Sequence, residues 1–212
     1  MVTKISAEMT TGLVAHTQTV PAAQTSSGNF TTPNGKLVQL DTNGQIDAGY
    51  LPTAVVNQFR LTSDLAITAS DQTLTAWEIP DTENQGNTSG SGGALTHSSG
   101  LFTFPSTGFY LVTATAFVER DTDNVDLITL KVESTNDASA GSPTFSSVVE
   151  SVVGVTGTVP KEVCSATVLI NVTNVTNDKF RVVGVADATG SSFAGSTTVN
   201  KTYLTVLKIA GT

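Results

Sequence analysis

The chain has little charge, few aromatic residues and a single cysteine. Charged residues make up 13% and aromatic residues 6% of its 212 residues. Because Cys164 has no second cysteine to pair with, an intrachain disulfide is impossible and the fold must depend on burial and hydrogen bonding. The alternating pattern around Cys164 predicts a small buried side chain and not a reactive thiol.

Basic residues and long apolar runs are also scarce. Ten lysines and arginines stand against eighteen aspartates and glutamates, which leaves a net charge of −8 and no basic run. Nucleic acid binding requires clustered positive charge, so we exclude it as a function. No apolar run approaches the roughly 20 residues that span a membrane. The first residues lack the apolar core of a signal peptide, and we therefore expect synthesis in a host cytoplasm and no membrane partner.

No catalytic motif is present. The two histidines, His16 and His97, lack a nearby nucleophile motif such as Gly-x-Ser-x-Gly. We expect both to lie on the surface or in loops. The sequence therefore predicts a protein that is not an enzyme and needs no cofactor.

One acidic loop is the only weak candidate for a metal site. Asp121, Asp123 and Asp126 offer carboxylates close together, as a calcium loop does. A calcium-binding EF-hand would place glycine at 126 and glutamate at 132, where this chain has Asp126 and Val132. We expect a solvated acidic turn and no bound metal.

The residues that are abundant indicate an all-β protein. Threonine, serine, valine and glycine dominate, and no segment of a dozen residues has helical periodicity. Short alternating runs separated by turn residues predict an antiparallel sandwich. Strands are expected near 59–67, 73–79, 94–97, 100–104, 108–119, 125–134, 144–153, 162–173, 179–186 and 202–209.

The chain changes character near its first quarter. Residues 1–57 are turn-rich and hold few large apolar side chains, so they cannot bury a core of their own. We expect an extended attachment segment over 1–57 and a head domain over 58–212.

The stretch 100–117 predicts a strand, a turn and a longer strand. Pro105 and Gly108 bound the turn, and apolar residues alternate on both sides of it. Along the longer strand one face carries Tyr110 and small apolar residues, and the other carries Leu111, threonines and Phe117. The last strand, 203–209, is apolar on both faces, which favours a central position covered by another subunit.

These landmarks give 58–212 a resemblance to the jelly-roll heads of the tumour necrosis factor and complement families. The resemblance is carried by Trp77, by Gly100-Leu-Phe-Thr-Phe-Pro105, by Gly108-Phe-Tyr110 and by Tyr203-Leu-Thr-Val-Leu207. It implies an internal hairpin at 100–117, a closing strand in the centre of a sheet, and a homotrimer packed through apolar and aromatic residues. The candidates for trimer interface or core are Trp77, Phe109, Tyr110, Phe117, Tyr203 and Leu207.

The segment 37–52 resembles a linker found in bacteriophage fibre and appendage proteins. It reads Leu37-Val-Gln-Leu-Asp-Thr-Asn-Gly-Gln-Ile-Asp-Ala-Gly-Tyr-Leu-Pro52. The resemblance implies a structural protein on the virion surface, a head fibre or capsid decoration that contacts other capsid or tail proteins and aids adhesion. The attachment candidates are Leu37, Leu40, Ile46, Tyr50 and Leu51.

An alternative is the receptor-binding tip of a tail fibre. In that case loops such as 84–93, 120–126 and 136–144 would contact a host surface glycan, and Trp77 with Phe109 could form a sugar platform. Aromatic residues in alternating strands are far more often core or subunit contacts. A secreted lectin or cytokine-like ligand, and an enzyme, are the less favoured classes.

Overall fold

The computed structural model describes residues 56–81, 94–120, 127–154 and 161–211, and the backbone of 31–32 and 35–36. The chain divides into two units, Met1–Pro52 and Thr53–Thr212. In the first unit β1 (Thr31–Thr32) and β2 (Gly35–Lys36) pair antiparallel, with Thr32 opposite Gly35. We call the second unit the head. None of the described residues forms a helix that is long and apolar enough to span a membrane.

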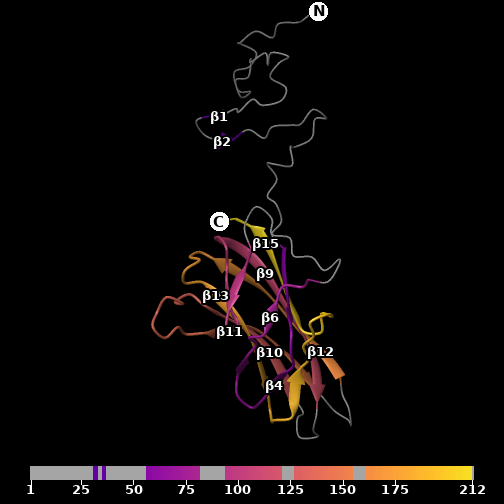
Figure 1. Cartoon of the computed structure of the whole chain (residues 1–212). Helices are drawn as coiled ribbons and strands as arrows, with labels where there is room; N and C mark the ends of the chain where they lie inside the picture. The colour runs from indigo at the N-terminus through magenta and orange to yellow at the C-terminus, as the bar shows by residue number, and fades with distance from the viewer. Residues whose placement is uncertain are drawn as a thin grey trace, which may run out of the picture. The chain divides into compact units, whose positions relative to one another are not determined.

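The head is an all-β sandwich of two antiparallel sheets (Figure 1). The β9 sheet has the order β4-β14-β9-β15-β3-β6, and β12 pairs with the remaining edge of β9. Its strands are β3 (Val56–Leu61), β4 (Leu65–Ile67), β6 (Trp77–Glu78), β9 (Gly108–Arg120), β12 (Lys161–Val172), β14 (Ser191–Phe193) and β15 (Tyr203–Ala210).

The β13 sheet forms the opposite layer. Its order is β11-β10-β13-β8-β7, and β5 pairs with β13. Its strands are β5 (Gln72–Thr73), β7 (Thr96–Ser98), β8 (Leu101–Thr103), β10 (Leu127–Thr135), β11 (Ser146–Gly154) and β13 (Lys179–Ala186). The expected all-β sandwich is confirmed.

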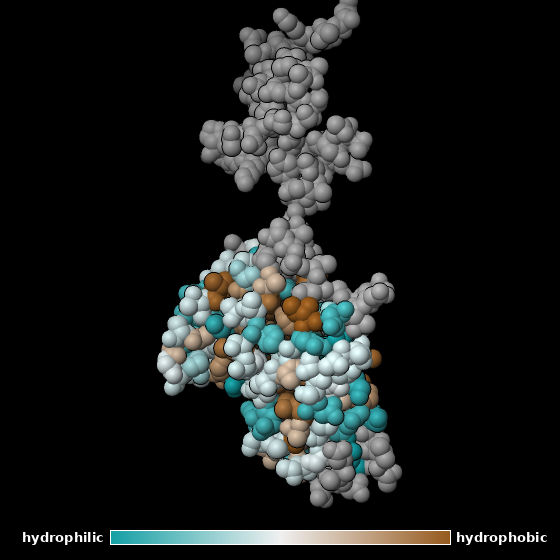
Figure 2. Space-filling view, viewed as in Figure 1, coloured by the Kyte–Doolittle hydropathy of each residue, from teal (hydrophilic) through white to brown (hydrophobic). Residues whose placement is uncertain are grey.

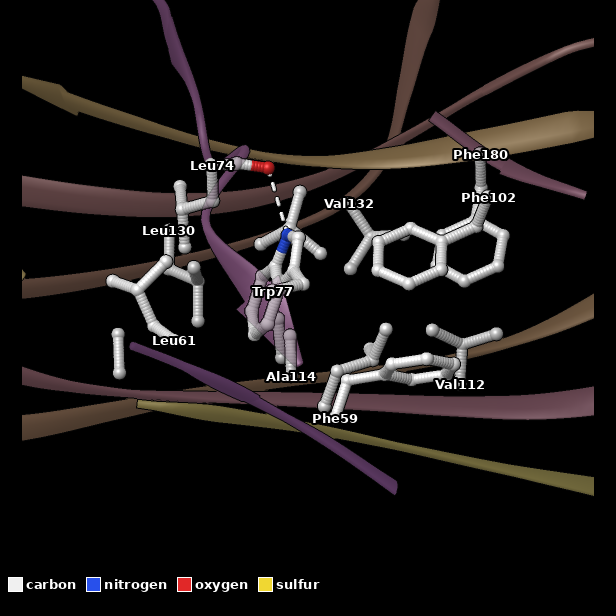
Figure 3. Close-up of a cluster of buried hydrophobic side chains, with 14 of the residues drawn as sticks. Phe59, Leu61, Leu74, Trp77, Phe102, Val112, Ala114, Leu130, Val132 and Phe180 are labelled. Atoms are coloured by element: carbon white, nitrogen blue, oxygen red, sulfur yellow. Dashed lines mark hydrogen bonds between the residues drawn. The ribbon is translucent and has the colours of Figure 1, made fainter. Parts of the chain in front are cut away.

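An aromatic cluster joins the two sheets. Phe102 on β8 stacks on Phe180 on β13, with ring centroids 4.8 Å apart and planes 12° apart. Phe59 and Trp77, from the β9 sheet, present ring edges to Phe102 at 5.2 and 5.8 Å. The Trp77 indole donates a 2.7 Å hydrogen bond to the carbonyl of Leu74, which gives its buried N–H a partner (Figure 3). Mixed aromatic packing of this kind fixes how the two layers face each other.

The predicted hairpin at 100–117 is wrong. β8 pairs with β7 and β13, whereas β9 lies in the other sheet, so the segment around Pro105 carries the chain from one layer to the other. Phe104 and Tyr110 on its two sides both point into the core, their rings 4.7 Å apart. The hairpin in this region is β7–β8, closed by Ser99 and Gly100, which have positive φ angles of 50° and 80°.

Other predicted strand bounds also change. The strand expected at 59–67 is divided into β3, which ends at Leu61, and β4, which begins at Leu65 and pairs with β14. The strand expected at 73–79 is divided between β5 and β6, which lie in different sheets. The short strand β14 was not expected, because Ser191–Phe193 follows a Gly/Ser-containing stretch that reads as a loop.

Candidate subunit interface

Strand β9 divides its side chains between the core and the outside of the sandwich. Residues at even positions from Gly108 to Arg120 are buried, and those at odd positions are half-buried. The outward set includes Phe109, Leu111, Thr113, Thr115 and Phe117. We call the outward side of β3, β15, β9 and β12 the outer face.

An apolar row crosses the outer face. Leu111 on β9 lies opposite Leu207 on β15 and Leu169 on β12, and Leu207 lies opposite Val56 on β3. The row is four strands wide, and Leu169 at its end is 54% exposed. Adjacent apolar side chains on a surface are suited to burial against a partner.

Two rows of polar side chains lie beside the apolar row. Thr113 and Thr167 share a hydroxyl hydrogen bond of 3.1 Å, and Thr115 and Ser165 share another of the same length. Gln58 continues the first row across β3 by donating to the hydroxyl of Thr205 at 3.4 Å. We call these two rows of polar side chains the hydroxyl band. Their side chains bond to one another along the sheet, so covering the band with a partner would leave few polar groups unpaired.

The far end of the outer face is both apolar and charged. Phe117 lies opposite Val163, which is 56% exposed. Lys161 pairs with Glu119 at 3.2 Å, and its ammonium lies 6.0 Å from the centre of the Phe117 ring. The outer face is therefore an apolar row, a hydroxyl band and a second apolar patch, bounded by an ion pair.

The structure sorts the predicted interface and core candidates into two groups. Trp77 and Tyr110 are core residues, with 6% and 0% exposure. Four candidates lie on the outer face, on β9 or β15: Phe109, Phe117, Tyr203 and Leu207. Trp77 and Phe109 therefore lie on opposite sides of the β9 sheet and form no common sugar platform.

Tyr203 stands at the edge of the hydroxyl band, opposite Thr115 and Arg60. The guanidinium of Arg60 is fully buried and pairs with Glu78 at 2.5 Å and Asp81 at 2.6 Å. Those carboxylates compensate its charge within the subunit. The outer face therefore does not end in an uncompensated cation at β3.

Two predicted groups lie outside the described residues. These are the attachment candidates Leu37, Leu40, Ile46, Tyr50 and Leu51, and the acidic-loop candidates Asp121, Asp123 and Asp126. Among the residues that are described, no group of three or more His, Cys, Asp or Glu side chains could hold a metal ion.

Sequence reasoning missed Leu169 and Val163 as members of the outer face. Their signal is present in the alternation of β12, where Cys164 and Ala166 are buried and their neighbours exposed. The row they complete requires the strand register, because β12 meets β9 from a segment about 50 residues away in sequence.

Cys164 is buried in the head and His97 is half-buried. Cys164 is buried, as expected, and burial raises the pKa of its thiol to about 11, so it is protonated at neutral pH. His97 lies on β7 with its ring 5.5 Å from those of Phe59 and Phe102, and burial lowers its pKa. His97 does not lie in a loop: it is a half-buried residue of strand β7 whose ring packs against the aromatic cluster.

Comparison with known proteins shows the fold alone. No family model and no curated protein matches the chain. Eiger TNF from S. frugiperda matches with a TM-score of 0.57 and 14% identity, over 75% of this chain and 94% of that one. Murine APRIL at pH 8.5 matches with a TM-score of 0.50 and 13% identity, over 74% of this chain and all of that one. The head of this protein is therefore a tumour necrosis factor-like jelly roll.

Proposed function

We propose that the protein is a homotrimeric virion appendage of a bacteriophage, in which three heads associate through their outer faces. The observation that carries the proposal is the apolar row from Val56 to Leu169, in which Leu169 is 54% exposed and Val56, Leu111 and Leu207 are half-buried in the single chain. Burying apolar surface contributes about 25 cal/mol per Å², so a row four strands wide supplies a substantial driving force. In a closed ring of identical subunits, every subunit buries the same face, and no such face is left exposed.

The attachment segment supports the virion part of the proposal. Residues 37–52 carry the phage-linker pattern, and residues 1–57 hold too few large apolar side chains to form a core. We propose that they bind a capsid or tail protein and that the trimer decorates the particle and aids adhesion. The role is structural: binding and surface burial take the place of catalysis.

A matched pair of substitutions tests the trimer contact. Leu169 on the outer face is 54% exposed, and Leu127, at the start of β10 in the other sheet, is 51% exposed. Leu169→Lys places a charge inside the proposed contact, whereas Leu127→Lys places the same charge on a free surface. We expect sedimentation analysis to show that Leu169→Lys raises the dissociation constant of the trimer at least tenfold over that of the parent chain. Leu127→Lys should leave this constant unchanged. Equal behaviour of the two variants would place the contact elsewhere.

Imaging of phage particles tests the location. Particles produced with an epitope-tagged chain should carry the tag at regular surface positions, seen by gold labelling in the electron microscope. Leu51→Asp should abolish labelling because it places a charge in the attachment segment, while the trimer persists in solution. Particles that never carry the tagged parent chain would contradict the virion assignment. The trimer contact would still be tested separately by the Leu169→Lys and Leu127→Lys variants.

A further inference from the structure

A polar cavity opens where two turns of the head meet. Its volume is about 330 Å³, and it is lined by the end of β10 and the turn that follows, by the start of β11, by the end of β12, and by the start of β13. Thr135 and Asp137 line it from the first turn, and Ile170, Asn171, Asp178 and Lys179 from the second. The volume is at the small end of the range for ligand sites. The cavity is formed by one copy of the chain, so it does not depend on the proposed trimer.

Two carboxylates hold the walls of the cavity in place. Oδ2 of Asp178 accepts hydrogen bonds from the backbone N–H groups of Thr173 at 2.6 Å and Asn174 at 2.8 Å. Asp137 accepts from the hydroxyl of Thr135 and, at 3.0 Å, from the N–H of Thr144. Each turn is therefore tied by its own aspartate. A cavity whose walls are already ordered loses little entropy when a ligand binds.

Binding groups remain after this internal bonding. Oδ1 of Asp178 and the ammonium of Lys179 have no hydrogen-bond or ion-pair partner within the described part of the chain. Asn136, in the first turn, also lines the cavity and adds an exposed amide with both a donor and an acceptor. Ile170 adds an apolar wall. The cavity thus combines acceptor, donor and apolar surface within one small volume.

The chemistry of the lining selects among classes of ligand. An apolar molecule would leave the hydroxyl, amide and carboxylate groups without partners. Calcium and magnesium take six or more oxygen ligands, and either ion would be repelled by Lys179. Two aspartates and one lysine give the lining a net negative charge, which disfavours an anion, as does the −8 of the whole chain. A neutral sugar satisfies every condition, since its hydroxyls both donate and accept and its C–H face can cover Ile170.

We propose that this cavity binds a neutral pyranose unit of a surface glycan, with the ammonium of Lys179 donating to a sugar oxygen and Oδ1 of Asp178 accepting from a sugar hydroxyl. The sugar hydroxyls replace the water that fills a polar cavity and reproduce its hydrogen bonds. A site of this kind fits a particle appendage that adheres to surfaces, and it fits a receptor-binding tip equally.

Saturation-transfer NMR on the full chain tests the site. The probes are glucose, galactose and N-acetylglucosamine, with glucuronic acid as the charged analogue and glycerol as a small polyol. We expect at least one neutral sugar to bind with a dissociation constant in the millimolar range. Lys179→Met removes a charge-assisted donor and should weaken binding about tenfold or more. Lys201→Met removes the same charge from an exposed loop residue and should leave binding unchanged.

Three results would overturn the proposal. The first is the absence of saturation transfer to every neutral sugar, and the second is equal binding by the Lys179→Met and Lys201→Met variants. The third is competition by glycerol or glucuronic acid as strong as that of the neutral sugars. A thermal melt of the Lys179→Met variant that matches the parent shows that lost binding reflects the lost ammonium and not unfolding.

Discussion

At the scale of single residues, burial separates side chains that the sequence groups together. Tyr110 and Phe109 are adjacent, yet Tyr110 is fully buried and donates to the carbonyl of Ser106 at 2.9 Å, whereas Phe109 lies on the outer face. Trp77, the only tryptophan, is enclosed by the aromatic cluster. Core residues and outer-face residues should therefore respond differently to truncation.

Truncating a core aromatic should destabilise the head in any oligomeric state. Trp77→Ala removes a buried ring and its hydrogen bond, and we expect a loss of about 3–5 kcal/mol in the free energy of unfolding, measured by urea denaturation. Phe109→Ala should cost the isolated subunit about 1 kcal/mol or less, since its ring is only half-buried, and should act mainly on association. Equal losses in the two variants would show that Phe109 also belongs to the core.

His97 should make stability depend on pH. Burial lowers its pKa in the folded head below 6.5, so the unfolded chain takes up the proton first as the pH falls. The contribution of His97 to the free energy of unfolding is constant above the pKa that it has in the unfolded chain. This contribution is lost as the pH falls through the lower pKa of the folded head. The melting temperature of the parent should therefore decrease more between pH 7.5 and 5.5 than that of His97→Phe, which keeps an aromatic ring in the cluster. Parallel melting curves for the two proteins would refute this role.

At the scale of strands, the alternation along β9 predicts correctly which side chains face the core. It cannot predict the partner strand, and for that reason the predicted hairpin at 100–117 is wrong. Proline and glycine form the turn whether the chain folds back in one sheet or crosses to the other. The rows of the outer face and the polar cavity depend on register and on turns far apart in sequence, neither of which a single sequence displays.

Gly108 should be required where β9 begins. Its φ is +142°, and a Cβ there would lie 2.3 Å from the carbonyl oxygen of Ala210 and 2.7 Å from Cε of Lys208. Gly108→Ala should therefore cost about 2 kcal/mol or more, through backbone strain and displacement of β15. Gly141→Ala, where a Cβ meets nothing within 4 Å, should change stability by less than about 1 kcal/mol. Urea midpoints of the two variants that agree would contradict the close approach of β9 and β15.

At the scale of the head, two layers enclose one core, and the outer face of the β9 sheet carries a continuous apolar row beside polar rows. Figure 2 shows one side of the head, where apolar residues form small groups among polar ones. β15 lies between β9 and β3, as expected for a closing strand in the centre of a sheet. Its Leu207 and Tyr203 face outward, where a second subunit would cover them. The all-β fold was thus predictable from composition and alternation, whereas the composition of the outer face could be read only from the assembled sheet.

The mass of the unmodified chain in solution tests the account most directly. Light scattering or native mass spectrometry at micromolar concentration should give three times the 21.9 kDa of one chain. The value should persist at high salt, because the proposed contact is mainly apolar and not ionic. A stable mass of 21.9 kDa at the same concentration would contradict the central claim that the outer face joins three heads.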